Sequence, residues 1–173
     1  EINTNHYSWS SGLISVADGV LRLDPRVDYA WSGVTSQTPV GQGVLVETRL
    51  KTAAITMDVI LGNESVRGAS GAVVTGGGYG VHYFPTKSPR TSFVRLDPVL
   101  LPTHLSPLYP LIADDTWTQV RFVYDSEGSW LAATTGEWSS GTDTTWLAES
   151  KYLHLFSMAK PADGYSGIKD IDY

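Results

Sequence analysis

Cysteine, long hydrophobic runs and clustered basic residues are all missing from this 173-residue chain. Without cysteine, a disulfide framework, a thiolate nucleophile and thiolate-ligated zinc or iron–sulfur centres are excluded. The apolar runs are as short as Val44–Val46 and Val99–Leu101, whereas a helix that spans a bilayer needs about 20 apolar residues. We therefore expect no membrane insertion.

The charge balance of the chain indicates which classes of partner it can bind. The chain carries 12 Lys and Arg against 18 Asp and Glu, a formal net charge of −6, and no three basic residues are consecutive. Proteins that bind phosphate backbones present clustered Lys and Arg. We expect no nucleic-acid partner.

Helical periodicity is missing as well. The 17 Gly and nine Pro separate short runs rich in β-branched and aromatic residues, which is typical of strands. The predicted strands are Gly19–Asp24, Gly43–Leu50, Ile55–Leu61, Ala72–Thr75, Tyr79–Phe84, Ser92–Leu96, Thr116–Tyr124, Trp130–Thr134, Tyr152–Met158 and Ile168–Tyr173. Asp97–Ile112 contains four prolines, so a loop or an edge segment is expected there. The pattern predicts one all-β domain over residues 1–173, an antiparallel β-sandwich (jelly roll) of two stacked sheets.

Three segments resemble the concanavalin A-like (laminin-G-like) jelly-roll domains. Asp115–Asp125 contains W-x-x-V-x-F-x-Y-D, Ser15–Leu23 is similar to the opening strand of that fold, and Gly167–Tyr173 is similar to its closing strand. The resemblance implies a closing strand that returns to the N-terminal edge. It also implies a function among lectins, carbohydrate-binding modules, glycanases and lyases, since one fold hosts many functions.

The sequence does not contain the residue patterns typical of glycanases or lyases. Glycanases need two carboxylates flanking the scissile bond, and the E-x-D-x-x-E pattern of similar enzymes is missing. Glu47 is expected on the solvent face beside Arg49. A lyase would need a His or Tyr base with an Arg, and His82 or Tyr83 are the candidates. The cation would come from Arg49, Arg90 or Arg95. A sugar groove without chemistry is the favoured interpretation of that segment.

Aromatic residues carry the functional hypothesis. Six Trp and nine Tyr outnumber four Phe, and their rings can stack on the apolar faces of sugars while polar neighbours bind hydroxyls. The candidate carbohydrate-binding residues are Tyr29, Trp31, Tyr79, His82, Tyr83, Arg90, Trp138 and Trp146. Burial of any of them is the alternative. Trp117, Phe122 and Tyr124 are interpreted mainly as core or sheet-packing residues. His154 is interpreted as a hydrogen-bonded core histidine, with a place on the binding face as the alternative.

No cofactor is required, but a structural calcium is common in domains of the resembled kind. The closing segment is similar to their Y-x-D-D-V ending, which implies Asp170 as a calcium ligand. A solvent-facing Asp170 beside a cation is the alternative.

The sequence thus predicts a non-catalytic carbohydrate-binding module that recognises a polysaccharide or other glycan through exposed aromatic residues and polar rim groups. A small polysaccharide lyase and a phage-fibre or cell-surface adhesion domain are the alternatives. Because the chain opens with Glu1 and no signal peptide, we expect a domain excised from a larger secreted or cell-surface protein. The oligomeric state is left open.

Overall fold

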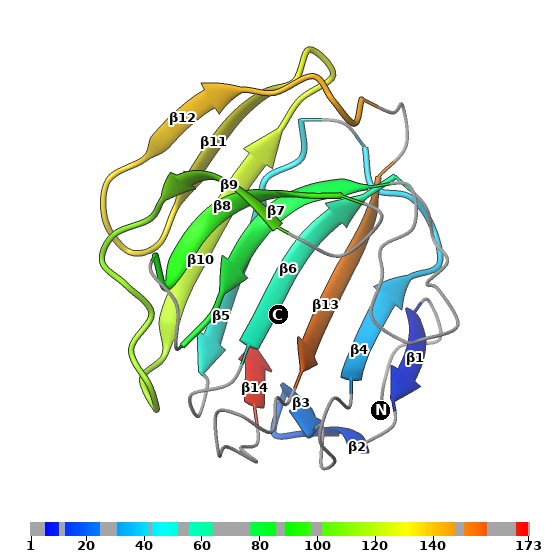
Figure 1. Ribbon diagram of the computed structural model, residues 1–173. Coiled ribbons are helices and arrows are strands. Elements are labelled where there is room, and N and C mark those ends of the chain that lie inside the picture. The colour runs from blue at the N-terminus through cyan, green and yellow to red at the C-terminus, as the bar shows by residue number, and fades with distance from the viewer. Residues whose placement is uncertain are drawn as a thin grey trace.

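A computed structural model shows two stacked antiparallel sheets (Figure 1). The structure describes residues 6–10, 13–24, 31–41, 43–51, 56–63, 77–85, 89–97, 102–147, 151–158 and 169–172. No helix occurs within these ranges, so they contain no apolar helix of membrane-spanning length. The predicted all-β sandwich is confirmed.

The front sheet, nearer the viewer in Figure 1, has seven strands in the order β1-β4-β13-β6-β7-β8-β9. Its strands are β1 (His6–Ser10), β4 (Trp31–Ser36), β6 (Thr56–Gly62), β7 (Gly78–Tyr83), β8 (Thr91–Leu96), β9 (Pro102–Pro107) and β13 (Tyr152–Met158).

The back sheet also has seven strands, in the order β12-β11-β10-β5-β14-β3-β2. They are β2 (Leu13–Ala17), β3 (Val20–Asp24), β5 (Val46–Lys51), β10 (Thr118–Tyr124), β11 (Ser129–Ala133), β12 (Ser139–Thr142) and β14 (Lys169–Asp172). As the resemblance implied, the closing strand β14 lies beside an N-terminal strand, pairing with β3 on one side and with β5 on the other.

The core lies between the sheets, where inward-facing side chains of both meet. The Phe93 ring of the front sheet stacks on Trp130 of the back sheet, with centroids 4.6 Å apart, and lies 5.8 Å from Phe122. Phe93 and Phe122 are fully buried. Burying such a side chain contributes about 1.5–3 kcal/mol, so these aromatic contacts hold the two layers together.

Strand alternation explains which residues reach this core. Along β10, Val120, Phe122 and Tyr124 are buried, whereas Gln119, Arg121 and Val123, which alternate with them, are partly exposed. The predicted burial of Phe122 and Tyr124 is confirmed. A period of two residues puts alternate side chains on opposite faces of a sheet.

Several predicted elements need correction. β1, β4 and β12 have no counterpart among the predicted strands. Ser15–Leu23, taken from the resemblance as a single opening strand, is a β2–β3 hairpin that turns at Asp18 and Gly19. The prolines of Asp97–Ile112 do mark an edge strand, β9. The predicted strand Ala72–Thr75 lies outside the described residues, and β7 pairs with β6 and β8.

Candidate functional site

Tyr79 and Tyr83 lie in the core. Tyr79 is 0% exposed and its ring stacks 3.9 Å from that of Tyr124, while Tyr83 is 1% exposed and donates a hydrogen bond of 2.7 Å to Asp114. Both were expected on a sugar-binding surface, and that exposure is wrong. The two tyrosines share a face of β7 with Val81, as predicted, but that face packs inward.

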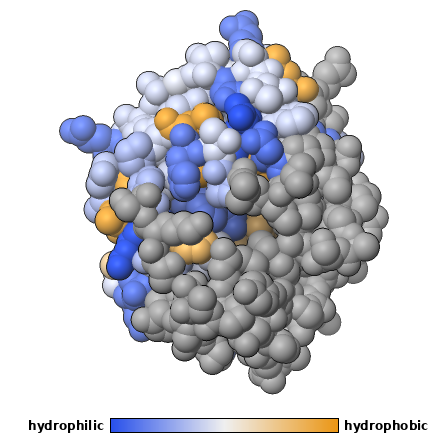
Figure 2. Space-filling model, viewed as in Figure 1, coloured by the Kyte–Doolittle hydropathy of each residue, from blue (hydrophilic) through white to orange (hydrophobic). Residues whose placement is uncertain are grey.

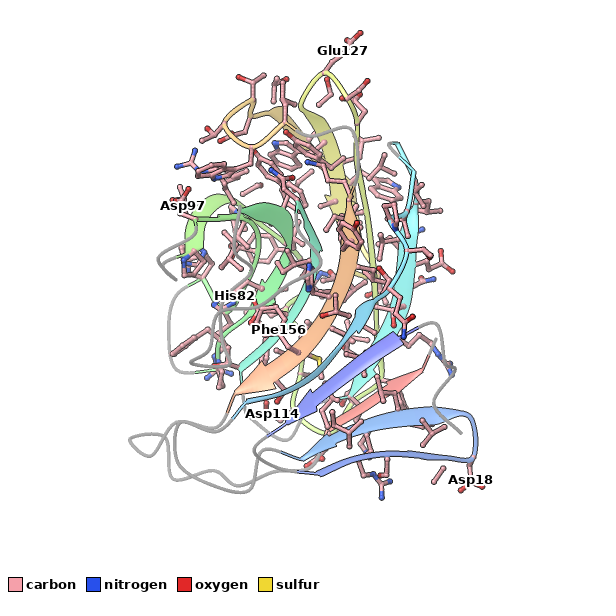
Figure 3. The ribbon with its side chains drawn as sticks, turned by 90° about the vertical axis from the view of Figure 1, so that its right-hand side faces the viewer. Asp18, His82, Asp97, Asp114, Glu127 and Phe156 are labelled. Carbon is pink, nitrogen blue, oxygen red and sulfur yellow. The ribbon has the colours of Figure 1, made fainter. Side chains whose placement is uncertain are left out.

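His82 lies on the opposite face of β7, which points away from the back sheet (Figure 3). Its Nδ1 atom lies 2.5 Å from Oδ1 of Asp58, the residue opposite it on β6. On the other side, Ser92 is opposite His82 and its hydroxyl lies 2.6 Å from Nδ1 of His104. The strand register thus assembles a polar row across the front sheet.

This polar row is closed to solvent over most of its length. Asp58 is 3% exposed, His82 6% and Ser92 0%. Where the front face is described, hydrophobic colour occurs in small separate areas (Figure 2). His154, on the same sheet, is fully buried with Nδ1 3.0 Å from the hydroxyl of Thr35, and its predicted role as a core histidine is confirmed.

Trp146 anchors a loop rather than presenting a free ring. It is half-buried, and its indole N–H donates to Asp97 at 2.8 Å. The ring also packs against Gly77, where an added Cβ would come within 2.5 Å of it. Arg95 donates to Asp97 and to Asp143, at 3.0 and 2.9 Å. The aromatic ring therefore contributes to a polar cluster at one end of the sandwich.

Electrostatics in this cluster favour ionised carboxylates. Desolvation by itself would raise the pKa of Asp143, but hydrogen bonds from Thr145 and Tyr79 and the charge of Arg95 lower that pKa below its ordinary value. Desolvation likewise opposes a low pKa at Asp97, yet donors from Trp146 and Arg95 lower it. Burial is also the main reason that the pKa of Tyr79 is raised.

Two other tryptophans are exposed on the outer face of the back sheet. Trp138 is 44% and Trp117 37% exposed. The Arg121 guanidinium carbon lies 4.7 Å from the centre of the Trp138 ring, and that of Arg49 lies 5.5 Å from the Trp117 ring. The interpretation of Trp117 as a core residue is wrong. It has the same parity along the chain as the outward Gln119 and Arg121.

We call this area the Trp–Arg surface and define it by Arg49, Trp117, Gln119, Arg121 and Trp138. The register makes it continuous, because Gln119 is opposite Arg49 and Arg121 is opposite Glu47 on the neighbouring strand. Diagonal neighbours in such a pair of strands lie about 7–8 Å apart, so both guanidinium groups are within reach of one extended ligand.

The remaining predicted residues are dispersed. Tyr29 lies outside the described residues. Trp31 begins β4 opposite Met158, and its side chain is outside the described part. Arg90 is exposed in the turn before β8. Asp170 lies on β14, opposite Arg22 and Lys51 in the register, so its proposed calcium contact stays a prediction.

The described residues do not fit a bound metal. No group of three or more His, Asp or Glu side chains within those ranges could hold an ion. The best-placed carboxylates are already engaged, since Asp58 pairs with His82 and Asp143 pairs with Arg95.

Comparison with known proteins establishes the fold. No family model and no curated protein matches the sequence. Among solved structures, the potassium-bound carbohydrate recognition domain of Emp46p superposes with a TM-score of 0.70 at 8% identity, covering 97% of this chain and 86% of that one. The Ca²⁺/Man-bound exoplasmic/lumenal domain of VIP36 gives 0.67 at 13%, covering 97% and 80%. Peanut lectin with a 9mer peptide gives 0.68 at 13%, covering 99% and 90%. The chain therefore has the concanavalin A-like jelly-roll fold.

Proposed function

We propose that this chain is a non-catalytic carbohydrate-binding domain that holds a polysaccharide on the Trp–Arg surface. The observation that carries the proposal is the exposure of Trp117 and Trp138 on one outer face, each beside a guanidinium group. Aromatic rings stack on the C–H faces of sugars, and planar donors bind their oxygens. The likeness in fold to carbohydrate recognition domains supports the same class of ligand.

The shape of the surface favours a chain of sugars over a single one. Trp117, Gln119 and Arg121 lie on the same side of one strand, and alternate residues of a strand repeat about every 6.6 Å. Such a row is flat and extended. We infer a polysaccharide ligand and, with the resemblance, a secreted or cell-surface location for a domain that belongs to a larger protein.

Several groups that a lyase would use are already engaged among the described residues. Tyr83 donates a hydrogen bond to Asp114. Of the candidate cations, Arg95 is paired with two carboxylates and Arg49 lies on the back sheet, whereas Arg90 is exposed just before β8. The engagement of Tyr83 and Arg95 supports binding without turnover.

The experiment is affinity electrophoresis against a panel of polysaccharides, with product formation followed by ultraviolet absorbance and reducing ends. We expect retardation without products. Trp138→Ala should weaken binding at least about fivefold, since one aromatic contact is worth about 1 kcal/mol beyond area burial. Tyr109→Ala is the matched control, because Tyr109 is 63% exposed and lies outside the Trp–Arg surface.

Loss of retardation in the Tyr109 variant but not in the Trp138 variant would place the site elsewhere. If none of the polysaccharides in the panel retards the protein, the carbohydrate proposal is overturned. Size-exclusion chromatography then tests the assembly alternative, for which the exposed Leu45 and Leu131 would be the contact residues.

A further inference from the structure

Guanidinium groups cover part of each exposed indole on the Trp–Arg surface. Arg121 lies over the Trp138 ring, and Arg49 lies near the Trp117 ring. A cation on an aromatic face occupies part of that face, and the exposed remainder of the ring is left for a sugar. The surface therefore presents guanidinium groups beside partly exposed aromatic rings.

Arg121 has unused hydrogen-bonding capacity. A guanidinium has five N–H donors, yet the hydrogen bond that Arg121 makes is a long contact of 3.5 Å from Nη2 to the carbonyl of Thr134. Its Nε is buried without a partner. Glu47 is directly opposite in the register, but Arg121 has no ion pair with a carboxylate among the described residues. Because Nε is buried, the remaining N–H donors on the Nη atoms are the ones that suit an oxyanion.

Basic and acidic residues both occur along this part of the back sheet. The described outward side chains of β3, β5 and β10 include four basic residues and Glu47, and β14, between β3 and β5, places Asp170 opposite Arg22 and Lys51 in the register. The basic residues are Arg22, Arg49, Lys51 and Arg121. The chain as a whole carries −6, so a polyanion would be repelled by the molecule at long range. Affinity for one would have to arise at this face.

We propose that the polysaccharide is acidic, and that its carboxylate or sulfate groups bind the guanidinium group of Arg121. This inference rests on the proposed carbohydrate-binding function. The indoles hold the guanidinium groups in place and contact the sugar rings between the acidic groups.

The experiment compares matched polymers that differ in charge. Polygalacturonate is paired with its carboxyl-reduced form, and dextran sulfate with dextran, in affinity electrophoresis at two salt concentrations. We expect the acidic member of at least one pair to bind at least about tenfold more tightly, with the difference decreasing as salt rises. The pair that shows the effect identifies carboxylate or sulfate as the bound group.

Equal binding of the charged and neutral members would overturn this inference while leaving the carbohydrate proposal intact. Binding to none of the four polymers, nor to any other glycan, would instead remove the function on which it rests.

Substitutions at Arg121 and Arg90 distinguish a specific contact with Arg121 from a general electrostatic attraction to basic residues. Arg121→Gln should weaken binding of the acidic polymer about tenfold and weaken binding of its neutral partner clearly less. Arg121→Lys should recover only part of the loss, because lysine keeps the charge but not the planar pair of donors. Arg90→Gln removes an exposed arginine from the turn before β8 and should have no effect. An equal loss in the Arg90 variant would contradict the proposed site, and thermal unfolding checks that each variant is folded.

Discussion

At the scale of single residues, Lys151 is the most unusual group in the described part of the chain. It is 1% exposed, and its ammonium group donates to Asn63 at 2.6 Å and to the carbonyl of Trp146 at 2.9 Å. It also lies 5.0 Å from the centre of the Tyr124 ring. Burial lowers the pKa of Lys151 to about 8, because an apolar environment disfavours the charged form.

This burial predicts a stability that rises with pH. The unfolded amine keeps its ordinary pKa of about 10.4, so the charge of Lys151 costs folding free energy fully below pH 8, and the cost is relieved as the pH rises toward 10. Relative to Lys151→Met, the wild-type free energy of unfolding should therefore increase on the order of 2–3 kcal/mol across that window. Urea unfolding at pH 7, 8, 9 and 10 measures it. Parallel curves for the two proteins would contradict the prediction.

At the scale of elements, the β2–β3 hairpin depends on its two turn residues. Asp18 and Gly19 have φ angles of 55° and 78°, the left-handed conformation that joins two strands without distorting their twist. Asp tolerates this region, and Gly has no Cβ to oppose it. An Asp-Gly pair between alternating apolar residues is also the signal by which the hairpin could have been predicted.

Gly19→Ala isolates the conformational cost, because an added Cβ would meet nothing within 4 Å. We expect a destabilisation of about 1–2 kcal/mol. Gly41→Ala is the matched control, since its Cβ would meet Val44 at an ordinary 3.5 Å and its φ is not left-handed. Chemical denaturation compares the two, and equal effects would show that the turn conformation is not the cause.

At the scale of the whole molecule, Asp143 connects the two sheets. Its carboxylate accepts hydrogen bonds from Tyr79 at 2.7 Å and Arg95 at 2.9 Å, both on the front sheet. Its backbone carbonyl accepts one from Tyr124 of the back sheet, also at 2.7 Å. One residue between β12 and the Trp146 loop thus links both layers at one end of the sandwich.

These contacts predict acid sensitivity. Since the pKa of Asp143 is lowered in the folded protein, its stabilisation is present above the ordinary pKa near 4 and is lost as the pH falls through the folded value. Asp143→Asn should cost about 1–3 kcal/mol at pH 7, and the difference from wild type should shrink at pH 3. Thermal unfolding at both pH values tests this, and a difference that does not depend on pH would contradict it.

The sequence determined the fold class, the exclusion of cysteine-dependent chemistry and the inward face of β10. These follow from composition and strand alternation, which can be read along the chain without knowing which strands pair. Val120, Phe122 and Tyr124 occupy alternate positions, with Gln119 and Arg121 among the residues in between, so their burial could be predicted from the sequence. The strands β1, β4 and β12 were missed because Ser and Gly interrupt their apolar pattern.

The tertiary structure alone decided which aromatic residues are available for binding. β7 is buried on both faces, and alternation shows which of its residues share a face, not what covers that face. Tyr79 and Tyr83 therefore could not be distinguished in the sequence from surface tyrosines. The Trp–Arg surface forms because antiparallel register places Arg49 and Arg121, 72 positions apart along the chain, on neighbouring strands. Such contacts depend on which strands pair, and strand pairing is a property of the whole sheet.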